Sequence, residues 1–198
     1  MVAEPVADST SPQLDARVVD TVRRWISTVV IHHQLCPFAR LPFEKDRIRF
    51  VHTNVTSPKS LLLTLKKETQ LLVDDDSIET SFIIHPRALE DFFVYNRFLK
   101  DGEKLLRGMG WEGLIQIASF HPQYLFADAD YDAPENFSNR SPYPMLHLLR
   151  EDSVDRAVSS YPDVNSIPAK NIETLNKLGA KKLQSLWDDC LKVPEIDG

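Results

Sequence analysis

The run Thr80-Ser81-Phe82-Ile83-Ile84-His85-Pro86 decides the fold class of this chain. It is short, aromatic and β-branched, and a His-Pro pair ends it, as is typical of a buried strand. The run Leu114-Ile115-Gln116-Ile117-Ala118-Ser119-Phe120-His121-Pro122 ends in the same way. Residues 47–52 alternate polar and apolar side chains, as a half-buried strand does. The sequence therefore predicts three strands.

Helices are predicted between and around these strands. Apolar residues recur at helical spacing over residues 58–73 and 89–106, so both connections between strands are expected to be helical crossovers. Strands joined in this way usually pair in parallel. A further helix is predicted before the first strand, over residues 14–33.

The C-terminal part of the chain is predicted to be helical after a long loop. Residues 123–144 are rich in Asp, Asn, Ser and Pro, lack periodicity and predict the loop. Helices are expected over residues 144–159, 168–178 and 180–191. The predicted fold is α/β, a small three-layer sandwich of order α-βαβαβ-loop-ααα with a mostly parallel sheet. We expect a single domain over 14–198, preceded by a disordered N-terminal tail over 1–13.

Composition limits the classes of partner. The 198 residues are 42% hydrophobic, enough for one full-sized core, and the formal net charge of −6 provides no basic field for a nucleic acid or an anionic membrane. No apolar run approaches the roughly 20 residues that span a bilayer. Cys36 and Cys190 lie far apart without an export signal, which predicts free thiols in a reducing compartment. We expect a cytoplasmic, soluble protein and leave its oligomeric state open.

Histidine follows all three predicted strands, as His52, His85 and His121. Ligands of open parallel sheets bind beyond the carboxyl ends of the strands, so these imidazoles are expected to face one crevice. Three neutral imidazoles can hold a divalent transition metal such as zinc, iron, copper or nickel. The alternative is that His-Pro is a strand-ending device whose ring hydrogen-bonds a nearby carbonyl.

A second candidate lies where the first helix ends. His32 and Cys36 are four residues apart and share a helix face, a spacing that suits half of a zinc site or a thiol activated as a nucleophile. The alternative is a buried cysteine that packs as a small hydrophobic side chain.

The third candidate is an anion site at the end of the long loop. Asn139, Arg140 and Ser141 precede the helix expected from Pro144, whose free N–H groups could hold a carboxylate or phosphate together with them. On that helix His147 and Arg150 would share one face. The alternative is that Arg140 and Arg150 pin the loop through carbonyls and carboxylates.

Several of these motifs together resemble a known family. They are Leu35-Cys36-Pro37-Phe38-Ala39, His85-Pro86, Ala118-Ser119-Phe120-His121-Pro122, Asn139-Arg140-Ser141-Pro142-Tyr143-Pro144 and His147-Leu148-Leu149-Arg150-Glu151. The chain resembles the domain of unknown function 1415 family over about residues 17–180, and this family implies no activity. Its pattern does not require histidine at positions 32, 33 and 52, which weakens the three-histidine site and the His32–Cys36 pair.

The leading hypothesis is an enzyme for small molecules, with its crevice at the strand ends. Cys36, His121 and His147 are its predicted catalytic residues, and His85 and His121 are the predicted metal ligands. A small anionic molecule is expected to bind Asn139, Arg140, Ser141 and Arg150. The competing hypothesis is a non-catalytic module that binds a metal or a metabolite.

Overall fold

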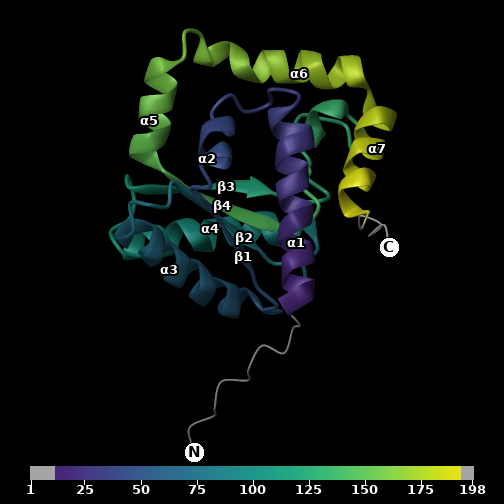
Figure 1. Cartoon of the computed structure of the whole chain (residues 1–198). Coiled ribbons are helices and arrows are strands. Elements are labelled where there is room, and N and C mark those ends of the chain that lie inside the picture. Colours follow the sequence, from purple (N-terminus) through teal and green to yellow (C-terminus); the bar gives the residue numbers. More distant parts are fainter. Residues whose placement is uncertain (1–11, 193–198) are drawn as a thin grey trace, which may run out of the picture.

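A computed structural model describes residues 12–192 and contains a four-stranded sheet with helices on both faces (Figure 1). Most of the predicted N-terminal tail thus lies outside the described residues. The strands are β1 (Ile48–His52), β2 (Thr80–Ile84), β3 (Ile115–Phe120) and β4 (Met145–Arg150), in the order β1-β2-β4-β3. β1 pairs with β2 in parallel, whereas β4 is antiparallel to both β2 and β3. The predicted mostly parallel sheet is wrong, since the sheet is mixed.

Strand β4 is the main departure from the sequence prediction, which placed a helix from residue 144. Its sequence Met-Leu-His-Leu-Leu-Arg contains no β-branched residue and is mostly composed of good helix formers. Between β2 and β3, however, this segment provides hydrogen-bond partners for the facing edges of both strands. The gain from pairing and burial outweighs the local preference. The helix α5 (Glu151–Ser160) begins only where β4 ends.

Helices α3 (Pro58–Asp74) and α4 (Phe92–Gly108) cover one face of the sheet, in a core that includes Leu65, Ile83 and Leu146. The side chain of Ser57 caps α3, with Pro58 at the first turn as predicted. α4 runs unbroken through Gly102. A Cβ atom at that position would lie 3.0 Å from Cδ1 of Ile117, so the missing side chain lets α4 approach β3 closely.

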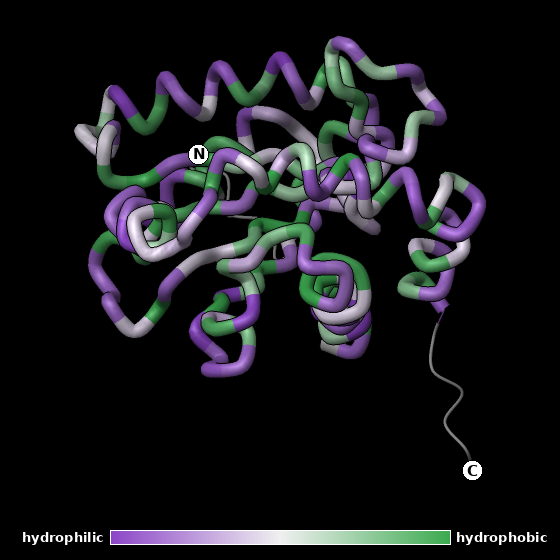
Figure 2. Tube along the Cα trace, turned by 90° about the horizontal axis from the view of Figure 1, so that it is seen from above, coloured by the Kyte–Doolittle hydropathy of each residue, from purple (hydrophilic) through white to green (hydrophobic). Residues whose placement is uncertain are grey.

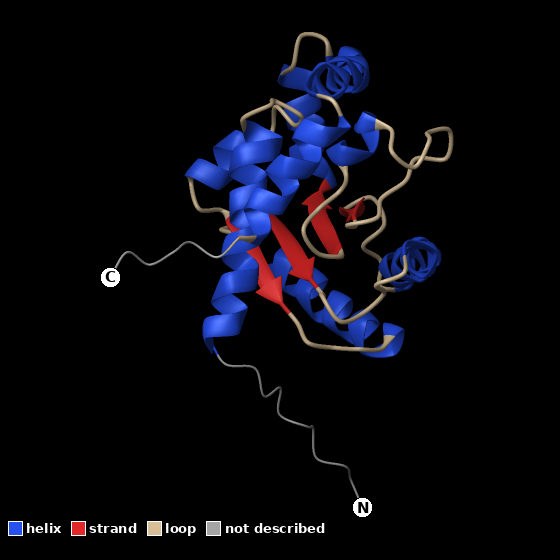
Figure 3. Ribbon diagram, turned by 90° about the vertical axis from the view of Figure 1, so that its right-hand side faces the viewer, coloured by secondary structure: helices blue, strands red, loops and turns tan. Residues whose placement is uncertain are grey.

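The opposite face is covered by α1 (Pro12–Trp25) and the π-helical turn η1 (Ile26–Ile31), in a core with Phe82, Ile84 and Met145. Figure 3 shows the strands enclosed between the two groups of helices. Along the helices in Figure 2, polar and apolar residues alternate as amphipathic packing requires.

The remaining elements surround the C-terminal end of α1. They are α2 (Arg40–Glu44), the 3₁₀ turns η2 (Pro134–Ser138) and η3 (Val164–Ser166), α6 (Ile167–Leu178) and α7 (Ala180–Leu191). In Figure 1, α5, α6 and α7 form an arch over this end of the molecule, and α7 descends beside α1. The predicted helices over residues 168–178 and 180–191 are confirmed.

Candidate functional site

A cavity of about 650 Å³ lies between the sheet and the face-covering elements α1 and η1. Its floor is the face of β2, β4 and β3, its walls come from α1, η1 and the segment around α2, and α5 closes one side. We call it the sheet cavity. Its walls are mainly apolar and include Trp25, Cys36, Phe38, Phe82, Phe120 and His147. Two of the three predicted catalytic residues, Cys36 and His147, therefore line one cavity.

His147 lies in the floor of this cavity because β4 pairs with β2. The pairing places His147 opposite Phe82, and the two rings stack with their centroids 3.8 Å apart. Oγ1 of Thr80 donates to the carbonyl of Leu148 at 2.5 Å, so this oxygen accepts the bond from Nε2 of His147 at 2.6 Å. The imidazole thus carries its proton on Nε2, which leaves a lone pair on Nδ1.

The Nδ1 atom of His147 is open to the cavity. Within residues 12–192 it has no hydrogen-bond partner, and it is not among the fully enclosed polar atoms that lack one. Burial lowers the pKa of His147 to about 3, because the charged imidazolium would be poorly solvated there. At neutral pH, His147 consequently presents a neutral hydrogen-bond acceptor to the cavity.

Cys36 contributes a thiol rather than a thiolate. Burial raises the pKa of this group, although the backbone N–H groups of Phe38 and Ala39 partly oppose the effect. A reactive cysteine normally has a lowered pKa and an electropositive surrounding. Cys36 and Cys190 are both free, as predicted for these two thiols. Cys190 is buried in the core beside α1.

The two histidines of the His-Pro pairs lie elsewhere and hold the loop before α4. Nδ1 of His85 contacts the carbonyl of Ala88 at 2.9 Å, and Nε2 of His121 contacts that of Leu89 at 3.1 Å. Leu89 has a φ of 57°, a conformation that needs such support. Both rings also contact that of Tyr95, and burial lowers the pKa of both histidines, to about 4 for His85. The alternative of a strand-ending device agrees with these bonds.

The predicted metal ligands are not surrounded by further ligands. Across the described part of the chain, no group of three or more His, Cys, Asp or Glu side chains is placed to hold a metal ion. Both ring nitrogens of His121 are engaged, since the N–H of Gln123 donates to Nδ1. Among the ring nitrogens of His85 and His121, only Nε2 of His85 lacks a partner, and it is fully enclosed.

His52 and His32 also lie apart from this pair. Nδ1 of His52 contacts a carboxylate oxygen of Asp15 at 2.6 Å, and the ring of His32 packs against that of His33. Of these three histidines, none lines the sheet cavity.

Arg140, predicted to bind an anion, is occupied by the loop itself. Its Nε donates to the carbonyl of Tyr124 at 3.1 Å, a terminal nitrogen donates to that of Tyr131, and the guanidinium lies over the ring of Phe137. These contacts agree with the alternative in which Arg140 pins the loop.

The two residues beside Arg140 are also bonded within the chain. Nδ2 of Asn139 donates to the carbonyl of Ser119 at 3.0 Å, and Oγ of Ser141 donates to that of Tyr143 at 2.6 Å. The three predicted anion-binding residues of this segment do not line the sheet cavity.

Arg150 cannot share a helix face with His147, so this part of the prediction is wrong. Successive side chains of a strand alternate, so the two residues, three positions apart, lie on opposite faces of β4, although Arg150 at the end of the strand also borders the sheet cavity. The guanidinium of Arg150 donates to the carbonyls of Leu72, Asp75 and Ile78 around the end of α3. Its role in the structure is to fasten that turn to β4.

Sequence reasoning missed Thr80 and Phe82, which fix the ring of His147. Both belong to the predicted strand, and their alternation already placed them on one face. What concealed their role was the helix assigned to residues 144–159, because only a strand at this place brings His147 opposite Phe82.

Comparison with known proteins gives a family but no activity. The family model described as a protein of unknown function (DUF1415) matches residues 17–185. Neither the curated proteins nor the solved structures yielded a match. Over residues 12–192, no helix combines the length and apolar character that a membrane crossing requires.

Proposed function

This chain belongs to the DUF1415 family of proteins of unknown function, and we propose that it binds an apolar small molecule in the sheet cavity. The observation that carries the proposal is the apolar hollow of about 650 Å³ with the free Nδ1 atom of His147 in its floor. Hollows of this size with a few convergent polar groups are typical binding sites for small molecules.

The lining favours a ligand with an aromatic or aliphatic body. Trp25, Phe38, Phe82 and Phe120 offer ring faces and edges, while Val154 and Ala157 of α5 close the opposite side. Burying about 200 Å² of apolar ligand surface contributes roughly 5 kcal/mol to binding. The lone pair of His147 adds selectivity for a ligand that carries a hydroxyl or N–H donor.

Binding accounts for the site better than catalysis does. A general base working near neutral pH needs a pKa close to 7, whereas the pKa of His147 is lowered to about 3. The Cys36 thiol, with its raised pKa, is largely protonated at the same pH. Neither group is prepared for proton transfer or nucleophilic attack before a ligand enters.

The test is calorimetric titration with 1-decanol, which has an apolar chain and one hydroxyl donor. We expect wild-type protein to bind it and Ala157→Trp, which fills the cavity from α5, to lose binding. Ser159→Trp adds the same bulk to an exposed position of α5 and serves as the matched control. Equal affinity of wild type and Ala157→Trp would refute binding in this cavity.

The hydroxyl contact is tested separately with His147→Phe, which keeps a ring on Phe82 and removes the acceptor. One neutral hydrogen bond corresponds to about 1 kcal/mol, so we expect roughly fivefold weaker binding of 1-decanol. Decyl methyl ether has no donor and should bind both proteins equally. If the ether and the alcohol lose affinity alike, His147 contributes shape and not a hydrogen bond.

A second candidate function is acyl transfer through Cys36, favoured by the observation that Cys36 and His147 line the same cavity. Attack of the Cys36 sulfur on a thioester would form an acyl-cysteine, release the leaving thiol and transfer the cysteine proton to it. Incubation with decanoyl-N-acetylcysteamine followed by mass spectrometry tests this. An adduct absent from Cys36→Ser supports the reaction, and an unmodified wild type argues for binding alone.

A further inference from the structure

A second hollow of about 450 Å³ lies under α6, next to the sheet cavity. We call it the α6 cavity. It is formed by the end of η1, the following turn and one side of α6, and its lining includes His33, Cys36, Pro37, Arg40, Lys170 and Lys177. In contrast to the sheet cavity, its lining is largely polar.

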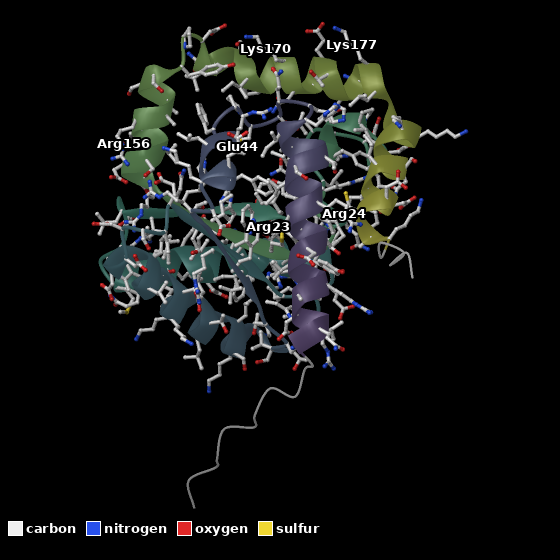
Figure 4. All side chains as sticks on the ribbon, viewed as in Figure 1. Arg23, Arg24, Glu44, Arg156, Lys170 and Lys177 are labelled. Atoms are coloured by element: carbon white, nitrogen blue, oxygen red, sulfur yellow. The ribbon has the colours of Figure 1, made fainter. Side chains whose placement is uncertain are left out.

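The α6 cavity carries an excess of positive charge. Arg40, Lys170 and Lys177 face a single lining carboxylate, Glu173, which gives a formal charge of 3 − 1 = +2. The whole chain has a net charge of −6, so this sign is local and opposite to that of the molecule. Lys170 and Lys177 both project from α6 (Figure 4).

Part of this charge is not neutralised by residues 12–192. Lys177 pairs with Glu173 at 2.6 Å, and Arg40 contacts Glu44 at 3.3 Å in an exposed pair of the weak kind. Lys170 has no ion pair in residues 12–192. An anion entering the α6 cavity therefore meets an uncompensated ammonium group and a loosely held guanidinium.

Four cations line the sheet cavity, and three of them are already occupied, whereas Lys45 has no ion pair in residues 12–192. Arg47 pairs with Glu79 at 3.1 Å and donates to two backbone carbonyls, and Arg156 pairs with Asp152 at 2.7 Å. Among the described residues, the sheet cavity thus offers an anion Lys45, while the α6 cavity offers Lys170 together with the weakly paired Arg40.

Cys36 and Pro37 line both hollows and form their common wall. A ligand with its apolar part on the sheet and its charged end below α6 would have to extend past Cys36 and Pro37. The two halves of the lining are thus complementary to the two halves of an amphipathic anion.

We propose that the ligand is an amphipathic anion, with its apolar body in the sheet cavity and a carboxylate or phosphate head in the α6 cavity. This inference rests on the proposed function. A fatty acid and an alkyl phosphate share the required chemistry. His147 then accepts a hydrogen bond from a donor at the far end of the chain, while Lys170, Lys177 and Arg40 hold the head.

The experiment compares 1-decanol, 10-hydroxydecanoate and 10-hydroxydecyl phosphate in calorimetric titrations of the full chain. Two partly exposed ion pairs strengthen binding by about tenfold, and this gain should shrink at high salt. We expect both anions to bind about tenfold more tightly than 1-decanol. Whichever of the two anions binds with the higher affinity identifies the head group of the ligand as a carboxylate or a phosphate.

The variant is Lys170→Glu combined with Lys177→Glu, in which the preference for the anions over 1-decanol should vanish. Lys59→Glu with Lys66→Glu changes the net charge equally on exposed positions of α3 and should keep the preference. An equal loss in both double variants would overturn the α6 cavity as the anion site.

Two further outcomes separate this inference from the proposed function. If 1-decanol binds wild type and the anions bind no more tightly, the inference fails while the sheet cavity remains a binding site. If neither 1-decanol nor the anions bind, the proposed function fails and the inference fails with it.

Discussion

Acidification should destabilise the protein through two buried histidines, His85 and His147. Burial lowers the pKa of His85 from 6.5 to about 4 and that of His147 from 6.5 to about 3. Below pH 6.5 the unfolded chain binds protons at these positions while the folded chain does not. Their stabilising contribution is therefore complete above pH 6.5 and is lost as the pH falls toward 4 and 3.

The size of the effect follows from these pKa values. Between pH 7 and pH 5 each histidine lowers the free energy of unfolding by about 2 kcal/mol, and the pair by about 4 kcal/mol. His147→Gln removes one titrating ring and keeps an N–H donor for Thr80. Over the same pH interval, the free energy of unfolding of the variant should therefore fall by about 2 kcal/mol less than that of wild type.

The assay is urea unfolding at pH 7, 6 and 5, followed by tryptophan fluorescence, since Trp25 is buried. For each protein, the free energy of unfolding at pH 5 is compared with that of the same protein at pH 7. A destabilisation that is equal at both pH values therefore does not affect the result. Ser159→Gln, at an exposed position without a titrating group, is the control and should behave as wild type does. If His147→Gln loses as much stability as wild type, the buried neutral state assigned to His147 is refuted.

Three other predictions concern the thiol, the long loop and the sheet. Because burial raises the pKa of Cys36, iodoacetamide should modify this thiol more slowly than it modifies glutathione at pH 7. The rates are measured by peptide mass spectrometry, and equal rates would contradict the prediction. Arg140→Ala removes a guanidinium bonded to two loop carbonyls and should lower the free energy of unfolding by about 3 kcal/mol without weakening 1-decanol binding. Weaker binding at unchanged stability would instead place Arg140 in a binding site. The Tyr95 hydroxyl donates a hydrogen bond to a β4 carbonyl and accepts one from a β3 N–H group. Tyr95→Phe should therefore lower the free energy of unfolding in urea by about 2 kcal/mol. An unchanged urea midpoint would show that these two bonds do not stabilise the protein.

The candidate site was only partly predictable. Cys36 and His147 were chosen for their chemistry, and the structure places both on the sheet cavity. His121 was chosen on the same grounds, but its ring bonds the loop before α4 instead. Residue type alone could not separate these cases, because an imidazole serves equally well as a ligand-facing acceptor and as a clasp for a carbonyl.

The sequence by itself determined the local elements. The cap Ser57-Pro58 marks the start of α3, and the strands before His85 and His121 end where the His-Pro pairs predict. Helical spacing likewise predicted α6 and α7. Caps, proline positions and periodic apolar residues act within a few residues along the chain, so they can be read without knowledge of distant partners.

Only the tertiary structure decided the identity of β4 and, with it, the site. The segment around His147 favours a helix locally, but the open edges of β2 and β3 supply backbone partners that no local pattern reveals. The same applies to the guanidinium group of Arg150, whose donors are taken by carbonyls remote in sequence. Long-range pairing and burial set the energy of these groups, and both depend on which segments meet in space.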